Sequence, residues 1–169
     1  MTSLRRLLAL SLFFFLFCPP LLHAAAIGYL RIEGIQGEVS VAPYEDHIEI
    51  LGFGQGITNP LTTSTGEVAD GRPDFQDIRV TKAIDSTSPL LYMRIAQGTV
   101  IPTVEFKFLK DAALYYTIEL TDAVITGVVP SMGSAVSTEM LSFAFKRIQW
   151  TITSGGVTSG WDVTTNTPL

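Results

Sequence analysis

Apolar and polar residues alternate along much of this chain, which is the pattern of β-strands that bury one face. Every second residue is apolar in 104–108 and again in 116–120, while the residues between them are Thr, Glu or Lys. The short stretch 110–113 separates the two segments and predicts a hairpin turn. We therefore expect two adjacent antiparallel strands here.

Further strands are expected at 28–33, 47–53 and 75–83, separated by turns rich in Gly, Pro and Thr. In the segment 139–152 the apolar positions shift by one place at 146–147. A shift of one position is what a β-bulge produces, so we expect a bulge there.

The segment 88–97 departs from this alternation and predicts a single short helix. Ser88 is a good residue to cap the first turn, and Pro89 fits the first helical position. Gly98 tolerates the positive φ at which many helices end. The residues expected to face the core are Leu90, Leu91 and Ile95.

The regular spacing of the strands favours a mainly β fold, either a small β-barrel or two packed antiparallel sheets, with the helix capping one side. The segment 57–74 has little periodicity and predicts an extended loop that is either functional or mobile. A shorter loop is expected at 128–137. We expect the tail from Ser154 to be frayed until Trp161 reaches a surface.

The first 26 residues have the three parts of a secretory signal peptide. Arg5 and Arg6 precede the apolar stretch 7–17, and a Pro pair leads to the small residues 24–26. That stretch is shorter than the roughly 20 residues of a membrane-spanning helix. Cys18 is a poor lipidation site, because bulky Phe17 precedes it and Pro19 follows it. We predict export to the periplasm or the extracellular space, with no stable membrane insertion after cleavage.

Cleavage after Ala26, or alternatively after Ala24, separates the signal peptide 1–26 from a single domain, 27–169. Removal of Arg5 and Arg6 leaves nine basic and sixteen acidic residues, a formal net charge of −7. Such a surface repels nucleic acid and anionic lipid.

The domain 27–169 has no cysteine and one histidine, His47. This composition excludes a cysteine nucleophile, a structural zinc site and a cluster of histidine ligands, so we expect no metal and no cofactor. His47 could act as a general base beside Glu45, Asp46 and Glu49, but a polar residue on an exposed strand face is the simpler interpretation.

Other candidate chemistry has simpler explanations. The glycines in 52–56 lack the following helix of a dinucleotide site and indicate a bulge or turn. The pairs among Asp70, Asp74 and Asp77 lack calcium-ligand spacing and indicate solvated turns. Lys82 and Asp85 predict an ion pair or a turn cap at a strand end. We expect no catalytic residue and no enzymatic activity.

Three blocks resemble the Hcp family, the hemolysin-coregulated proteins that form the inner tube of bacterial type VI secretion systems. Residues 79–98 carry a similar TK-x-(I/V)-D-x-(S/T)-S-P-x-L pattern before their helix. The block 47–56, HIEILGFGQG, is similar to the family's second-strand block, and 139–152 has its K-x-I-x-W ending. The similarity runs from about Tyr29 to Trp161.

The resemblance implies a small β-barrel with one short helix. It also implies a ring of six subunits around a channel, with rings that stack into a tube, a spike protein at its tip and effector cargo in its lumen. In that family the loop that corresponds to 57–74 contacts neighbouring subunits. The interface residues expected in this loop are Asn59, Pro60, Leu61, Thr62, Arg72, Pro73 and Phe75.

Two other classes of function stay open at this point. One is an exported monomeric β-sandwich that binds a glycan, peptide or envelope partner in a pocket. The residues expected to line that pocket include some of Phe53, Tyr92, Tyr115 and Trp161. The other is a hydrolase that uses His47 or paired carboxylates.

Overall fold

The computed structural model describes residues 28–59, 62–64, 67–69, 72–133 and 135–169, so the predicted signal peptide lies outside the described residues. The elements are, in chain order, β1 (Gly28–Ile32), β2 (Ile48–Ile50), β3 (Gly52–Gly54), β4 (Ile57–Thr58), β5 (Thr62–Ser64), β6 (Glu67–Ala69), β7 (Asp74–Phe75), β8 (Ile78–Ala83), α1 (Ser88–Gln97), β9 (Ile101–Lys110), β10 (Ala113–Ser131), β11 (Thr138–Ala144), β12 (Arg147–Ile152), β13 (Val157–Asp162) and β14 (Thr167–Pro168).

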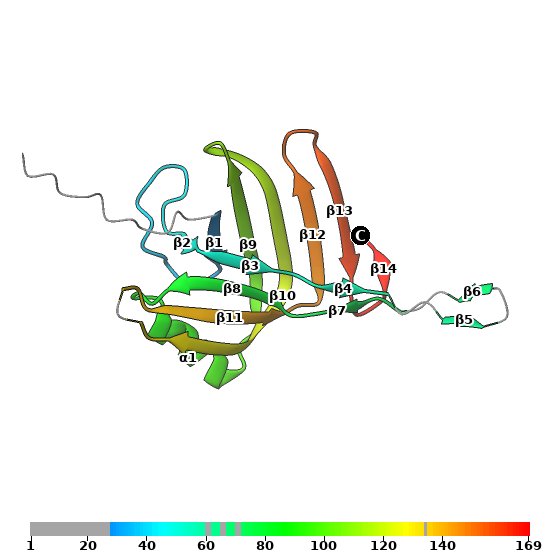
Figure 1. Ribbon diagram of the computed structural model, residues 1–169, viewed down its shortest axis with the longest axis horizontal. Coiled ribbons are helices and arrows are strands. Elements are labelled where there is room, and N and C mark those ends of the chain that lie inside the picture. Colours follow the sequence, from blue (N-terminus) through cyan, green and yellow to red (C-terminus); the bar gives the residue numbers. More distant parts are fainter. Residues whose placement is uncertain (1–27, 60–61, 65–66, 70–71, 134) are drawn as a thin grey trace, which may run out of the picture.

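Two antiparallel sheets share the long strand β10 (Figure 1). Sheet A has the order β2–β1–β9–β10–β12–β13–β14, and sheet B has the order β10–β11–β8–β3. Residues 113–123 of β10 pair within sheet A, and residues 124–131 pair with β11. On the other side, β2 and β3 flank Leu51, whose amide donates to the Thr81 carbonyl over 2.8 Å. The sheets thus close into a small barrel, which confirms the predicted fold class.

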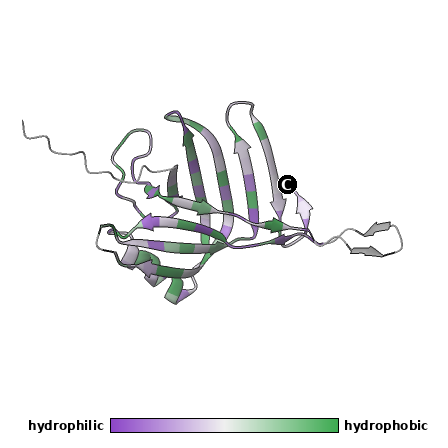
Figure 2. Ribbon diagram, in the orientation of Figure 1, coloured by the Kyte–Doolittle hydropathy of each residue, from purple (hydrophilic) through white to green (hydrophobic). Residues whose placement is uncertain are grey.

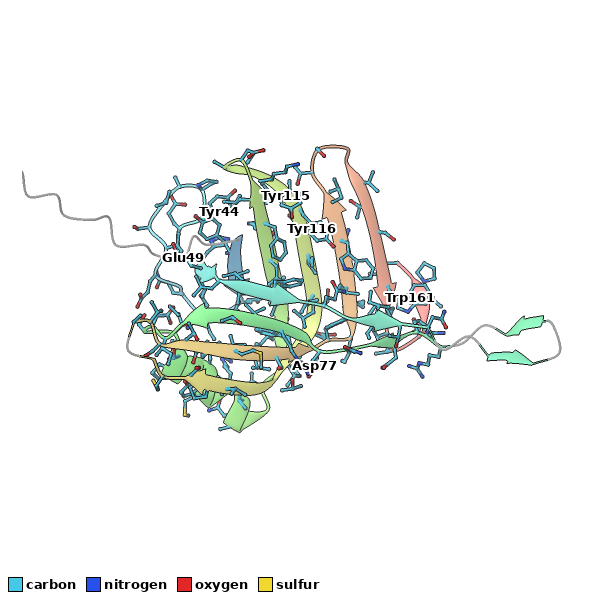
Figure 3. The ribbon with its side chains drawn as sticks, viewed as in Figure 1. Tyr44, Glu49, Asp77, Tyr115, Tyr116 and Trp161 are labelled. Carbon is cyan, nitrogen blue, oxygen red and sulfur yellow. The ribbon has the colours of Figure 1, made fainter. Side chains whose placement is uncertain are left out.

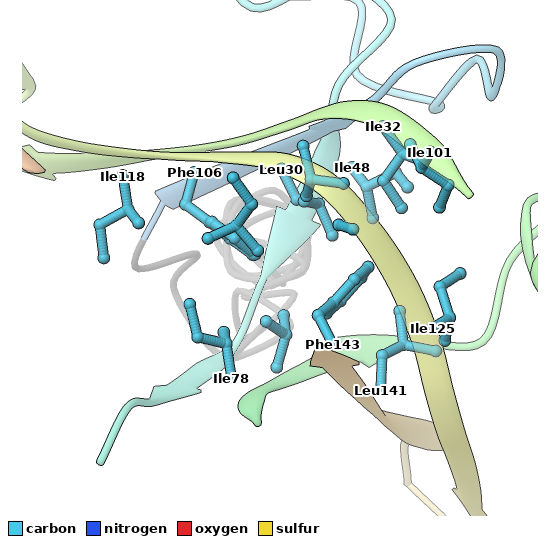
Figure 4. Packing of buried hydrophobic residues seen from close by; sticks show 14 of the residues in the cluster. Leu30, Ile32, Ile48, Ile78, Ile101, Phe106, Ile118, Ile125, Leu141 and Phe143 are labelled. Carbon is cyan, nitrogen blue, oxygen red and sulfur yellow. The ribbon is translucent and has the colours of Figure 1, made fainter. Parts of the chain in front are cut away.

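The core lies between the inner faces of the two sheets (Figure 4). Phe106 of sheet A is fully buried and contacts Phe143 of sheet B, with ring centroids 5.9 Å apart. Phe53 lies edge-on to Phe106 and Phe108 at 5.4 and 4.8 Å. The alternation in 104–108 and 116–120 is confirmed, because these apolar positions face inward. Each such side chain contributes about 1.5–3 kcal/mol when fully buried.

The predicted hairpin turn at 110–113 connects β9 and β10. Asp111 and Ala112 have φ values of 52° and 62°, a conformation that side chains with a Cβ adopt only at some energetic cost. The helix prediction is also confirmed, and α1 ends at Gly98 with φ 60°. Two details of the helix prediction were wrong. Ser88 does not cap the first turn, because its hydroxyl turns into the interior, and Leu90 is 50% exposed.

Three expectations about irregular segments are corrected. The shift at 146–147 is the point where the chain leaves sheet B and enters sheet A, because β11 pairs with β8 whereas β12 pairs with β10. The predicted loop 128–137 is shorter, since β10 continues to Ser131. The tail is not frayed: β13 and β14 extend sheet A to Pro168.

The segment 57–74 contains short paired strands. β4 pairs with β7 to form what we call the strap, and β5 pairs with β6 to form what we call the arm. The strap crosses in front of β12 and β13, and the arm extends away from the body of the molecule (Figure 1). No helix of the described residues is long and apolar enough to cross a membrane.

Candidate functional site

A buried ionic cluster joins sheet B to the helix. The Lys82 ammonium lies 2.7 Å from Glu139 Oε1 and 2.9 Å from Asp85 Oδ1. It also donates to the Ala83 carbonyl over 2.8 Å and to Ser88 Oγ over 3.2 Å. The side chains of Lys82 and Glu139 are fully buried. Because acceptors surround the ammonium, the cluster fastens two strands to α1 and leaves no free amine for covalent chemistry.

The predicted Lys82–Asp85 pair is confirmed, and Asp85 also caps the turn before the helix by accepting from the Thr87 amide over 2.8 Å. Sequence reasoning missed Glu139 and Tyr92 as members of the cluster. Glu139 lies on β11, and the Tyr92 hydroxyl donates to its Oε2 over 2.7 Å. This hydrogen bond, with a smaller effect of desolvation, raises the pKa of Tyr92 above its ordinary value.

The prediction that His47 lies on an exposed strand face was wrong, since this residue is 4% exposed. The Tyr29 and Tyr44 rings stack at 4.3 Å, and both lie edge-on to the imidazole. His47 Nδ1 lies 2.8 Å from the Glu45 carbonyl, and Nε2 lies 3.5 Å from Lys107 Nζ. Both ring nitrogens therefore face groups of the chain itself, a carbonyl and an ammonium, and this arrangement does not support the hydrolase hypothesis.

The acidic residues do not converge on a metal site. In the part of the chain that the structure describes, no group of three or more His, Cys, Asp or Glu residues could hold a metal ion. Asp77 accepts from the Thr126 hydroxyl, and Asp70 lies outside the described residues. Gly52 and Gly54 belong to β3 rather than to a bulge or turn. A Cβ at Gly52 would lie 3.3 Å from the Thr81 side chain, a tight contact.

The predicted interface residues lie in different surroundings. Asn59 is exposed, Pro60 and Leu61 lie outside the described residues, and Thr62 begins β5. Pro73 precedes β7. The Arg72 guanidinium donates to the Val163 carbonyl over 2.8 Å, which ties the strap to the loop after β13.

Phe75 contacts the chain's own core. Its ring stacks on Trp150 at 6.3 Å and lies edge-on to Phe145 at 6.1 Å. Phe75 therefore holds the strap in place. The role of this whole set of residues in subunit contacts stays a prediction.

The outer faces of the two sheets differ in charge, although strands of both alternate between hydrophobic and hydrophilic positions (Figure 2). Cross-strand rows on the outer face of sheet A contain charged residues, such as Arg31 opposite Glu105, with Glu119 beside them. On the outer face of sheet B, the charged side chain among the outward positions of the described strands is Arg79. The other outward positions of this face are Gly52, Gly54, Thr81, Ala83, Val124, Gly127, Val129, Ser131, Thr138, Met140, Ser142 and Ala144.

The aromatic residues expected to line a binding pocket do not come together. Phe53 packs in the core, Tyr92 lies on α1, and Tyr115 and Trp161 lie on different strands, well apart in Figure 3. An open hollow of about 760 Å³ is lined instead by residues of the β1–β2 region and of strands β9 and β10. A second hollow of about 330 Å³ lies beside His47. None of the four aromatic residues lines either hollow.

Comparison with known proteins assigns this arrangement to a family. Residues 29–152 match the family model described as type VI secretion system effector, Hcp. The chain belongs to the Hcp family. None of the curated proteins matches it in sequence. Hcp is a structural and effector family of type VI secretion systems, and this chain shares its fold.

Solved Hcp structures superpose on most of the chain. Hcp1 from Salmonella typhimurium has a TM-score of 0.74 and 25% identity, covering 86% of this chain and 100% of that one. Hcp1 from E. coli EAEC 042 pathovar has a TM-score of 0.73 and 28% identity, covering 82% and 99%. Secreted protein Hcp3 from Pseudomonas aeruginosa, at 22% identity and a TM-score of 0.65, shows the shared fold, covering 82% and 98%.

A signal for the missed cluster was present in the sequence. Ile78 and Val80 lie on the inward face of their strand, and the same alternation places Lys82 inward. In 139–143 the alternation places Glu139 inward with Leu141 and Phe143. Two opposite charges on buried faces must pair, because an isolated buried charge is very costly. Their partnership could have been inferred before the strands were known to be neighbours.

Proposed function

We propose that the domain 27–169 assembles head to tail into a closed ring of six copies, and that such rings stack into a tube of the type VI secretion kind. The observation that carries the proposal is the family match, which spans the barrel from β1 to β12. Assembly is a mechanical function, and it needs neither a cofactor nor a catalytic residue. Spike protein and effector cargo are the other partners that the family suggests.

The surface of the chain supports this function. The arm extends away from the body of the molecule, which suits an element that contacts a neighbouring subunit (Figure 1). Sheet A ends at β14, a two-residue strand that leaves part of β13 unpaired. Unpaired edges are sites of association between chains, and a contact between two different patches generates a ring or a filament.

The solution mass of the domain tests the proposal. The protein starting at Ile27 is expected to elute with six times the mass of one chain and to appear as annuli by negative-stain microscopy. A single copy at every concentration from micromolar to millimolar would overturn the ring and leave the monomeric binding module. The four aromatic residues expected for that alternative do not line a common pocket.

Export through the signal peptide 1–26 is a separate part of the proposal. Its support is the arrangement of Arg5, Arg6, the apolar stretch 7–17 and the small residues 24–26. The intact chain, expressed in a Gram-negative host, is expected in the periplasm or the medium with Ile27, or alternatively Ala25, as its first residue. Mass spectrometry of the recovered protein checks this. Retention of Met1 in a cytoplasmic protein would contradict export.

A further inference from the structure

Opposite edges of sheet A each expose apolar side chains. At the β2 edge, the loop between β1 and β2 exposes Val41, at 63%. At the other edge, the hairpin of β12 and β13 exposes Ile152 and Val157, at 38% and 64%. Ile152 and Val157 are directly paired and continue the inward-facing row of the sheet through Tyr116. Each edge therefore has an apolar spot that its own chain leaves uncovered.

The uncovered spots lie at the same level of the sheet. Tyr44 accompanies Val41, whose carbonyl accepts from the Tyr44 amide over 2.8 Å. Tyr44, labelled at the upper left of Figure 3, stacks on Tyr29. The cross-strand row that starts at Tyr29 ends at Thr158, the residue after Val157. If one copy continues the sheet of the next without a shift, Val41 meets the hairpin of β12 and β13.

The two edges differ in charge. Residues 33–49, from the loop through the edge strand β2, contain five acidic side chains and no Lys or Arg. Residues 145–169, at the opposite edge, contain Lys146, Arg147 and one acid, Asp162. Lys146 and Arg147 lie 3.6 and 3.8 Å from the carboxylate of Asp122, and Asp162 is the cross-strand neighbour of Arg147, so positive and negative charges balance there. In a domain of net charge −7, an edge without excess negative charge lets an acidic loop dock with little repulsion.

The edge strand is open for such a contact. Pairing of β13 with β14 covers Trp161 and Asp162, and the Leu169 amide donates to the Gly160 carbonyl. Main-chain groups two residues apart point the same way in a strand, so those of Thr158 lie on the open side.

We propose that the β1–β2 loop of one copy docks against the exposed end of the β12–β13 hairpin of the next copy, and that this contact closes the ring. The inference rests on the proposed ring function and names its interface. A standard interface buries about 800 Å² on each partner, more than Val41, Ile152 and Val157 expose, so the contact includes the flanking charges and is completed by the arm. Because the two patches differ, the contact is head to tail, as ring closure requires.

Cysteine cross-linking tests the contact directly, because the domain 27–169 contains no native cysteine. The double variant Val41→Cys/Val157→Cys, treated with a short bismaleimide, is expected to give a ladder of covalent oligomers. Each single variant is expected to give none, since identical positions on neighbouring copies do not meet. The matched control is Val129→Cys/Val157→Cys, because Val129 is 59% exposed on the outer face of sheet B. A ladder from the control, or none from the first pair, would overturn the proposed interface.

The mass of the unmodified domain separates the two proposals. If it is a ring and the 41–157 pair does not cross-link, the interface is wrong and the ring function stands. If it is a single copy, both fail.

Discussion

The barrel is closed in two different ways at the helix and at the strap. At the helix, the side chains of Lys82 and Glu139 are fully buried. The Lys82 ammonium donates to Glu139, Asp85, Ser88 and the Ala83 carbonyl. At the strap, Phe75 covers Trp150 by aromatic contact. The polar contacts there are the Trp150 indole donating to Gln55 Oε1 over 3.2 Å and the Arg72 guanidinium donating to the Val163 carbonyl over 2.8 Å.

The difference extends to unpaired polar groups. Gln55 Nε2 and Trp161 Nε1, both near the strap, are buried without a hydrogen-bond partner among the described residues. Such groups lower stability, whereas a buried pair with all its contacts fixes one arrangement of its strands. We conclude that paired charges fix the helix side in one arrangement, and that the strap side, which crosses β12 and β13, is held more loosely.

The largest expected effect is the loss of one partner in the buried ion pair. Glu139→Ala leaves the Lys82 ammonium buried beside Asp85 alone among carboxylates, and we expect the free energy of unfolding to fall by about 3–5 kcal/mol. Urea unfolding at fixed protein concentration measures this change. The double variant Lys82→Met/Glu139→Leu is the control, because it removes both charges and should lose clearly less. If both variants lose the same free energy of unfolding, the unpaired Lys82 charge is not the cause of the loss.

A smaller loss is expected at the strap. Phe75→Ala removes the ring that covers Trp150 and contacts Phe145, and we expect a loss of about 2–3 kcal/mol because the ring is only partly buried. The fluorescence of Trp150 should shift to longer wavelength as water reaches it. Asn59→Ala, an exposed position beside the strap, should change stability by less than about 0.5 kcal/mol. An unchanged emission spectrum in Phe75→Ala would mean that the strap does not cover Trp150.

These two sides were not equally predictable from sequence. The helix 88–97, its end at Gly98 and the pair of Lys82 with Asp85 are set by residues close together in the chain, and local rules predicted them. Glu139 was missed because its partner is 57 positions away, although the alternation placed both charges inward.

The strap was missed for a different reason. The segment 57–74 is rich in Thr, Gly and Pro and has no alternation, so it indicated a loop. What orders its base is packing on distant parts of the chain: Phe75 on Trp150 and Arg72 on the Val163 carbonyl. Likewise, the burial of His47 depends on Tyr29, which lies 18 positions earlier, so strand alternation alone could not show it.

A still smaller effect is expected at Tyr92, on the rim of the ionic cluster. Tyr92→Phe removes the donor to Glu139 Oε2 and should cost less stability than Phe75→Ala. The pKa of Tyr92 is raised in the folded state, so its contribution is fully present below the ordinary tyrosine pKa of 10.0 and is lost as the pH rises through the raised value. The stability difference between wild type and variant should therefore be constant from pH 7 to 9 and shrink above about pH 10. A difference that grows with alkaline pH would contradict the hydrogen bond.

The smallest effect is expected at Trp161, and it is the most direct test of the contrast between the two sides. Replacing a partly buried Trp by Phe normally loses apolar contact, but Trp161→Phe also removes a buried N–H that lacks an acceptor among the described residues. An unsatisfied buried donor costs about 1–3 kcal/mol, so the two changes should nearly cancel and leave stability within about 1 kcal/mol of wild type. Trp150→Phe is the matched control, because its indole N–H is bonded to Gln55, and it should lose more. If Trp161→Phe proves as damaging as Trp150→Phe, the strap side is as fully paired as the helix side, and the reason for expecting it to be the looser of the two disappears.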